Sequence, residues 1–111
     1  MISAIVSRDG IDVRGHSGYA PAGSDIVCAG VSALLNAFID SAGRDVTVEE
    51  ADAKTVIQIK THTKETEAKF KMLVTGLKGI EDEFPEFVHI HDQAFMSLNG
   101  TIESSIETIT K

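Results

Sequence analysis

The spacing of apolar residues along the chain predicts five strands and two helices. Alternating or short apolar runs indicate strands over residues 2–7, 11–14, 45–49, 55–61 and 86–91. Helical spacing places Val27, Val31, Leu34, Leu35 and Phe38 on one helix face, and Phe70, Leu73, Val74, Leu77, Ile80 and Phe84 on another. Hairpins interleaved with helices in this order predict a two-layer α+β domain. We expect a mostly antiparallel sheet with both helices on one face.

Glycine and proline positions refine this prediction. The pair Asp9-Gly10 predicts a type I′ hairpin turn, which needs positive φ at both residues. Gly30 costs a helix roughly 1 kcal/mol relative to alanine, so we expect a neighbour too close for a methyl group. Gly76 and Gly79 should bend the second helix or end it early, and Pro85 should terminate it.

The pattern predicts one domain over residues 1–92 and an appendage over residues 93–111. Within the appendage, Asn99-Gly100 indicates a turn, whereas Ile102, Ile106 and Ile109 fit neither a strand nor a strong helix. The pattern does not specify whether this appendage is ordered.

Composition narrows the possible partners and locations. The 111 residues carry a net charge of −7, which argues against direct binding of nucleic acid or of an anionic membrane surface. The N-terminus lacks the features of a signal peptide, and we expect no apolar run of membrane-spanning length. A single cysteine suits a reducing compartment. A cytoplasmic location is the resulting expectation.

The segment over residues 14–33 holds the residues best suited to chemistry. His16 follows the second predicted strand, and Cys28, the only cysteine, falls in the first turn of the first predicted helix. Free backbone N–H groups and the helix dipole favour a thiolate there, and a thiolate is a nucleophile. A nearby histidine can take the proton and return it. These residues suggest a Cys–His enzyme that needs no metal or organic cofactor.

Two residues near Cys28 each have two possible roles. Asp25 can cap the helix, which we favour, or orient His16 as the third group of a triad. Ser32, one turn beyond Cys28, can hydrogen-bond near the sulfur or back to a helix carbonyl. Backbone N–H groups around Cys28 are candidate donors to an oxyanion.

The loop before the helix and two further histidines each allow a functional and a structural interpretation. Gly18 and Gly23 can let the loop move over a bound peptide or simply serve turns. Tyr19 can line the peptide site or pack on the sheet. His89 and His91 share one side of a strand, but no further ligand has a recognisable spacing, so we predict no metal site.

The motifs GHSGY over residues 15–19 and GSDIVCAGVSA over residues 23–33 resemble the ribosomal-processing cysteine protease family (Prp) of bacteria. The resemblance implies a small α+β fold, a homodimer, and a cysteine endopeptidase with Cys28 as nucleophile and His16 as base. It also implies the substrate: the N-terminal extension of large-subunit ribosomal protein twenty-seven, cut behind an aromatic residue. Ser17 stands where the family often has alanine, and the tail beyond about His91 has no counterpart.

Two other functions compete with an acyl-enzyme protease. One is a non-catalytic binding module that engages a ribosomal protein during assembly. The other is a thiol redox sensor, because a lone cysteine with an accessible thiolate oxidises readily.

Overall fold

The computed structural model describes residues 1–93, so almost all of the expected appendage lies outside the described residues. The elements in chain order are β1 (Ile2–Ser7), β2 (Gly10–Arg14), α1 (Ile26–Ala42), a 3-10 turn (Gly43–Asp45), β3 (Val46–Ala51), β4 (Lys54–Ile59), α2 (Lys64–Glu83) and β5 (Val88–Asp92). The predicted order of strands and helices is confirmed.

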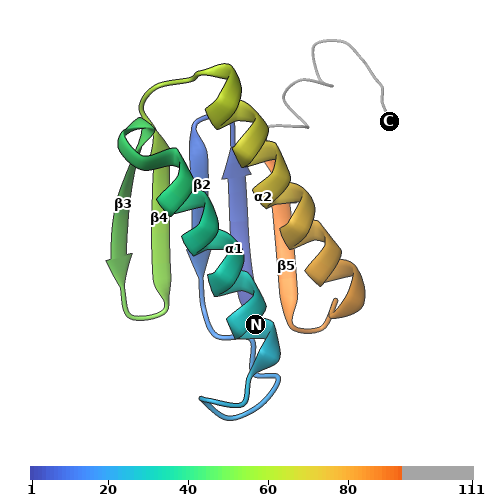
Figure 1. Ribbon diagram of the computed structural model, residues 1–111. Coiled ribbons are helices and arrows are strands. Elements are labelled where there is room, and N and C mark those ends of the chain that lie inside the picture. Colours follow the sequence, from blue (N-terminus) through green and yellow to red (C-terminus); the bar gives the residue numbers. More distant parts are fainter. Residues whose placement is uncertain (94–111) are drawn as a thin grey trace.

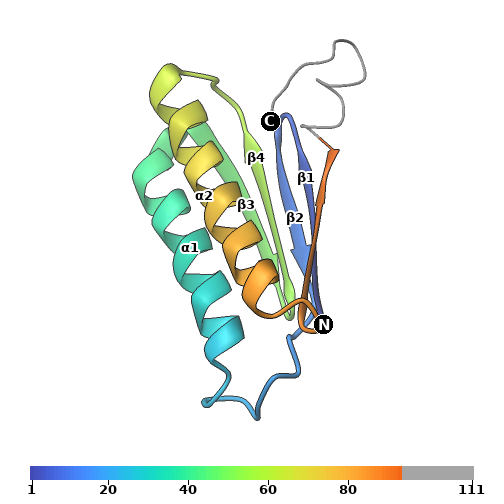
Figure 2. The same ribbon diagram turned by 90° about the vertical axis from the view of Figure 1, so that its right-hand side faces the viewer.

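The described residues form two layers (Figures 1 and 2). One layer is a five-stranded sheet in the order β3-β4-β2-β1-β5. Only the β1–β5 pair is parallel; the other three pairs are antiparallel. Both helices cover the same face of the sheet, as Figure 2 shows. The predicted α+β class, with its mostly antiparallel sheet and helices on one face, is confirmed.

The core lies between the layers and is built mainly from aliphatic side chains. The strands contribute residues such as Ala4, Val6 and Ile57, all at most 1% exposed, and the helices contribute Val27 and Leu77. Burial of such side chains is the main favourable contribution to folding. The core fixes α1 over the strand that precedes it, which determines where the first turn of α1 lies.

The two helices contact each other at glycines. A Cβ atom on Gly30 of α1 would lie 3.3 Å from Cδ1 of Ile80, so the predicted close neighbour is present. A Cβ atom on Gly76 of α2 would lie 2.9 Å from Cδ1 of Leu34. The alternative that α2 ends early at its glycines was wrong, since the helix runs unbroken from Lys64 to Glu83. At Gly76 the missing side chain makes room for Leu34, which favours packing of the continuous helix.

The first hairpin also differs from its prediction. The turn consists of Arg8 and Asp9, because Ser7 pairs with Gly10, and only Gly10 of the predicted pair has positive φ. Glycine is required there by a close approach of two strands: a Cβ atom on Gly10 would lie 2.0 Å from the carbonyl oxygen of Ile57.

The expectation that no apolar run reaches membrane-spanning length was wrong, as judged by length and composition. Within the segment Ile26–Asp45, an 18-residue stretch has a mean hydropathy of 1.6, enough for a membrane-spanning helix by length and composition alone. In the structure this segment contains α1, and Val27, Val31 and Phe38 are buried in the core.

At the end of the molecule away from the β2–α1 loop, His62 joins the β1–β2 turn to the start of α2. Its Nε2 lies 3.0 Å from Oδ1 of Asp9, and its Nδ1 contacts Oε2 of Glu67. Both ring nitrogens can donate only when the imidazole is protonated. The hydrogen bond to Glu67, with help from Asp9, raises the pKa of His62 above its ordinary 6.5.

We predict that this contact stabilises the fold most at acidic to neutral pH. Because the pKa of His62 is raised on folding, its contribution is complete below pH 6.5 and disappears as the pH rises through the raised value. The melting temperature of the wild type should therefore fall relative to His62→Gln as the pH increases from about 6 to 9. The matched control is His91→Gln. Melting curves of wild type and His62→Gln that keep a constant separation over this range would contradict the prediction.

Candidate active site

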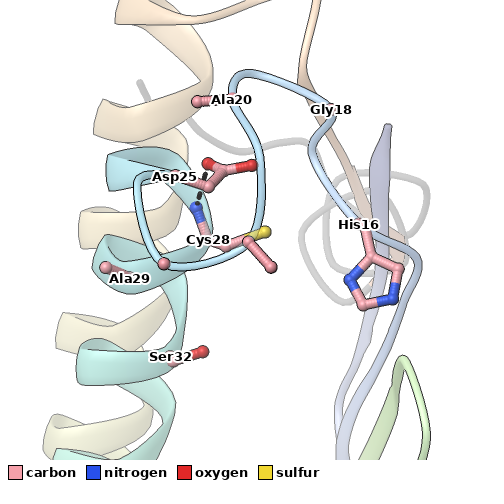
Figure 3. Close-up of a pocket in the computed structure, with 9 residues that line it drawn as sticks. His16, Gly18, Ala20, Asp25, Cys28, Ala29 and Ser32 are labelled. Carbon is pink, nitrogen blue, oxygen red and sulfur yellow. Dashed lines mark hydrogen bonds between the residues drawn. The ribbon is translucent and has the colours of Figure 1, made fainter.

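A cavity of about 500 Å³ lies where β2 ends and α1 begins. Most of its lining residues are small, and they come from the β2–α1 loop and the first turns of α1: His16, Gly18, Ala20, Ala22, Gly23, Asp25, Cys28, Ala29 and Ser32. Figure 3 shows Cys28 on α1 and His16 beyond the end of β2, on opposite sides of the cavity. The fold therefore brings the predicted nucleophile and base to one concave site.

Asp25 caps α1 and so determines where Cys28 lies. Its Oδ1 accepts hydrogen bonds from the backbone N–H groups of Val27 at 3.0 Å and Cys28 at 2.9 Å. A cap of this kind contributes about 1 kcal/mol to a helix. These contacts agree with the prediction that Asp25 caps the helix.

The second oxygen of Asp25 contacts Ser17, which stands where the family often has alanine. The Ser17 hydroxyl donates to Oδ2 of Asp25 at 2.5 Å. This hydrogen bond, followed by those from the backbone of Cys28, lowers the pKa of Asp25 from 3.8 to about 2. Because both carboxylate oxygens are engaged, the structure gives no support to the alternative that Asp25 orients His16.

Ser17 also contacts the sulfur directly. Its backbone N–H donates to Cys28 Sγ at 3.3 Å, and its hydroxyl oxygen accepts from the backbone N–H of Tyr19 at 3.1 Å. The residue is only 3% exposed, so its hydroxyl is a buried polar group whose partners hold the loop in place. An N–H that points at the sulfur stabilises negative charge there. A small polar residue directly after a candidate base was the only sequence signal for this role.

His16 lies at the mouth of the site and is exposed. Within residues 1–93, no hydrogen bond joins its imidazole to the thiol of Cys28. It lies between two glycines with positive φ, Gly15 at 98° and Gly18 at 74°. The backbone on both sides of His16 is held, because the Gly15 N–H donates to the Ala53 carbonyl at 2.9 Å and Ser17 contacts Asp25 and Cys28. Rotation of the exposed side chain is therefore the motion that can bring the imidazole closer when a substrate binds.

The remaining loop residues separate into two groups. Gly18 and Gly23 line the cavity, and both have positive φ. The ring of Tyr19 instead packs edge-on against Phe84 and Phe87, with 5.4 Å between ring centroids in each pair. Tyr19 thus fixes the loop to the connection between α2 and β5, and it is absent from the cavity lining.

The expected oxyanion donors are largely occupied. The N–H groups of Val27 and Cys28 donate to Asp25, and the N–H of Ala29 donates to the Asp25 carbonyl at 3.1 Å. As they stand, these amides cannot also bind a substrate oxyanion. The backbone N–H of Ser17, which already points at the sulfur, is a better placed donor.

Of the remaining predicted residues, Ser32 lines the cavity and the two histidines of β5 do not. Ser32 is exposed and lines the cavity one turn beyond Cys28. His89 and His91 stack edge-on 4.6 Å apart on β5, and neither lines the cavity. The described part of the chain contains no group of three or more potential metal ligands.

Comparison with known proteins gives consistent matches over this domain. The model of the family described as cysteine protease Prp matches residues 1–89. The ribosomal processing cysteine protease Prp of Mycoplasma pneumoniae is 28% identical over 97 residues, which cover 84% of this chain and 96% of that protein. The protein of the same name from Mycoplasma genitalium is 22% identical over 98 residues, covering 86% and 99%.

A solved structure also shares the fold. The essential ribosomal processing protease Prp from S. aureus, crystallised with a covalently linked product peptide, superposes with a TM-score of 0.73 at 22% identity. The match covers 82% of this chain and 96% of that one.

We predict that Ser17→Ala slows alkylation of Cys28 by iodoacetamide at pH 7. Loss of the hydroxyl removes the contacts to Asp25 and Tyr19 that hold the Ser17 N–H against the sulfur. A hydrogen bond worth about 0.5–1.5 kcal/mol corresponds to a rate lower by about 2- to 10-fold. Ser24→Ala, in the same loop but exposed, is the control and should react at the wild-type rate. If both variants react as fast as the wild type, the Ser17 hydroxyl does not position the loop.

Proposed function

The chain belongs to the family of the cysteine protease Prp and is a cysteine protease, and we propose that Cys28 is its nucleophile and His16 its general base. The observation that supports this assignment is the cavity itself. It contains the only cysteine of the chain, placed in the first turn of α1, and the single histidine that lines the same cavity within the described residues.

The proposed reaction proceeds through a thioester. His16 takes the thiol proton of Cys28, and the sulfur attacks the carbonyl carbon of the scissile peptide bond. His16 then gives this proton to the leaving amine as the carbon–nitrogen bond breaks. A water molecule next loses a proton to His16 and attacks the thioester. The carboxylate product leaves, and the proton returns to the sulfur.

The neighbours of the dyad have supporting roles in this proposal. Asp25 holds the first turn of α1, and with a pKa of about 2 it stays ionised throughout the neutral range. The Ser17 N–H, 3.3 Å from Sγ, stabilises negative charge on the sulfur before attack. It then lies next to the oxyanion of the tetrahedral intermediate. Ser32 lines the path of the substrate.

We propose the N-terminal extension of large-subunit ribosomal protein twenty-seven as the substrate, cut behind an aromatic residue. The relatives from Mycoplasma are named for ribosomal processing, and the S. aureus protein was crystallised with peptides. The net charge of −7 suits a basic ribosomal protein. A cytoplasmic location and a homodimer belong to the same proposal. Membership of a protease family disfavours the binding module and the redox sensor.

We predict that the wild-type protein cleaves a peptide spanning the junction of this extension. Cys28→Ala should abolish cleavage because no other cysteine can form the thioester. His16→Ala should reduce kcat/KM by about 100- to 10,000-fold, the usual contribution of a general base. The measurement is the mass spectrum of the peptide over time.

His91→Ala is the control for this experiment, since His91 lies on β5, outside the cavity lining and outside the β2–α1 loop. This variant should cleave at the wild-type rate. Cleavage that survives both Cys28→Ala and His16→Ala would disprove the dyad. Binding of the peptide by the wild type without any cleavage would favour the binding module.

A further inference from the structure

The loop beside Cys28 is attached by a single large side chain to a part of the fold outside the dyad. The ring of Tyr19 packs edge-on against Phe84 and Phe87, which lie between α2 and β5 and which we call the aromatic seat. Edge-on pairs at this separation are a favoured arrangement of aromatic rings. Among residues 18–24, only Tyr19 has a side chain larger than proline.

We propose that the two phenylalanines of the aromatic seat are positioning residues for the nucleophile. They act on Cys28 through Tyr19 and Ser17. The inference rests on the proposed function, because it takes Cys28 as the nucleophile. It gives the connection between α2 and β5 a role in the reactivity of the thiol, although neither phenylalanine lines the cavity.

Hydrogen bonds connect the seated ring to the sulfur. The backbone N–H of Tyr19 donates to the hydroxyl oxygen of Ser17 at 3.1 Å, and this hydroxyl donates to Oδ2 of Asp25 at 2.5 Å. The backbone N–H of the same serine donates to Cys28 Sγ at 3.3 Å. A ring that stays on its seat therefore holds the serine in the position that directs an N–H at the sulfur.

The aromatic seat is itself fixed to both layers of the fold. The backbone N–H of Phe84 donates to the carbonyl oxygen of Ile80 at 2.8 Å, at the end of α2. The carbonyl oxygen of Phe87 accepts from the backbone N–H of Ile2 at 2.9 Å, at the start of β1. Both rings are half-buried and pack against the hydrophobic core. The seat can therefore serve as a fixed support for the loop.

The rest of the loop is small and open to solvent. Residues 21–24 are exposed. The ring of Tyr19 and the hydrogen bonds around Asp25 attach the loop to the rest of the protein. Removal of the ring should therefore loosen the residues next to Ser17, while the cap of α1 stays in place.

Alkylation of Cys28 by iodoacetamide at pH 7 tests the proposal without any need for peptide cleavage. Tyr19→Ala should slow the reaction by about 2- to 10-fold, the usual effect of losing one hydrogen bond. Phe87→Leu keeps an apolar side chain but removes a ring from the seat, so it should slow the reaction by about twofold or more. Tyr19→Phe keeps the ring and should react at the wild-type rate.

A double variant distinguishes positioning from a general loosening of the loop. If the ring and the serine hydroxyl act through the same N–H, Ser17→Ala combined with Tyr19→Ala should react no more slowly than the slower single variant. Independent effects would multiply. A double variant slowed by the product of the two single effects would overturn the proposal.

Fluorescence shows directly whether the ring has left its seat. Tyr19 is the only tyrosine and the chain has no tryptophan, so tyrosine emission reports on this ring alone. Quenching by acrylamide should increase in Phe87→Leu. Increased quenching together with an unchanged alkylation rate would show that the seat holds the ring without positioning the thiol, and would overturn the proposal.

Phe70→Leu is the matched control. Phe70 is buried and pairs with Phe38 toward the other end of α1, with 5.6 Å between ring centroids. This variant also loses an aromatic pair, so it should lower the melting temperature but keep the alkylation rate and the quenching of the wild type. Equal slowing of alkylation in Phe70→Leu and Phe87→Leu would attribute the effect to lost stability and overturn the proposal.

Peptide cleavage separates this inference from the proposed function. Tyr19→Ala should lower kcat and leave KM nearly unchanged, because Tyr19 lines no part of the cavity. If the wild type cleaved no peptide, the proposed function would fail, but the alkylation rates would still decide the positioning role. Wild-type alkylation rates in both Tyr19→Ala and Phe87→Leu would overturn the positioning role and leave the dyad intact.

Discussion

The carboxylate of Asp25 is the contact on which the site depends. One oxygen fixes the first turn of α1 through the amides of Val27 and Cys28, and the other holds the Ser17 hydroxyl. A single side chain thereby connects the helix that carries the thiol to the loop that carries His16. Without it, the core would still fix the body of α1, but not the loop against its first turn.

Ser17 extends this connection to the sulfur of Cys28. Its hydroxyl faces the carboxylate and its amide faces Sγ, so the peptide unit after His16 is held against the nucleophile. The imidazole itself is left exposed and separate from the thiol. The structure thus combines a fixed nucleophile with a base whose backbone is held and whose exposed side chain can rotate. Such a division suits an enzyme that completes its site when a polypeptide enters.

Sequence patterns were sufficient for the fold and for the position of the thiol. Alternation and helical spacing located the five strands and both α-helices of the described chain, and the cap at Asp25 followed from its place before an apolar helix. They failed where a contact between distant residues decides the outcome. Gly76 accommodates Leu34 of the other helix, and Gly10 accommodates the carbonyl of Ile57. The contacts of Ser17 also depend on segments brought together only by folding.

The parallel pair of strands has a consequence for synthesis. β1 is made first, yet its neighbour β5 is made last, and Ile2 pairs with Val88. Long sequence separation slows such pairing. Until the ribosome has released β5, one edge of β1 lacks its partner, and bare strand edges are prone to association with other chains. Protein chains that terminate prematurely within α2 should therefore be prone to aggregate, although they already contain both Cys28 and His16.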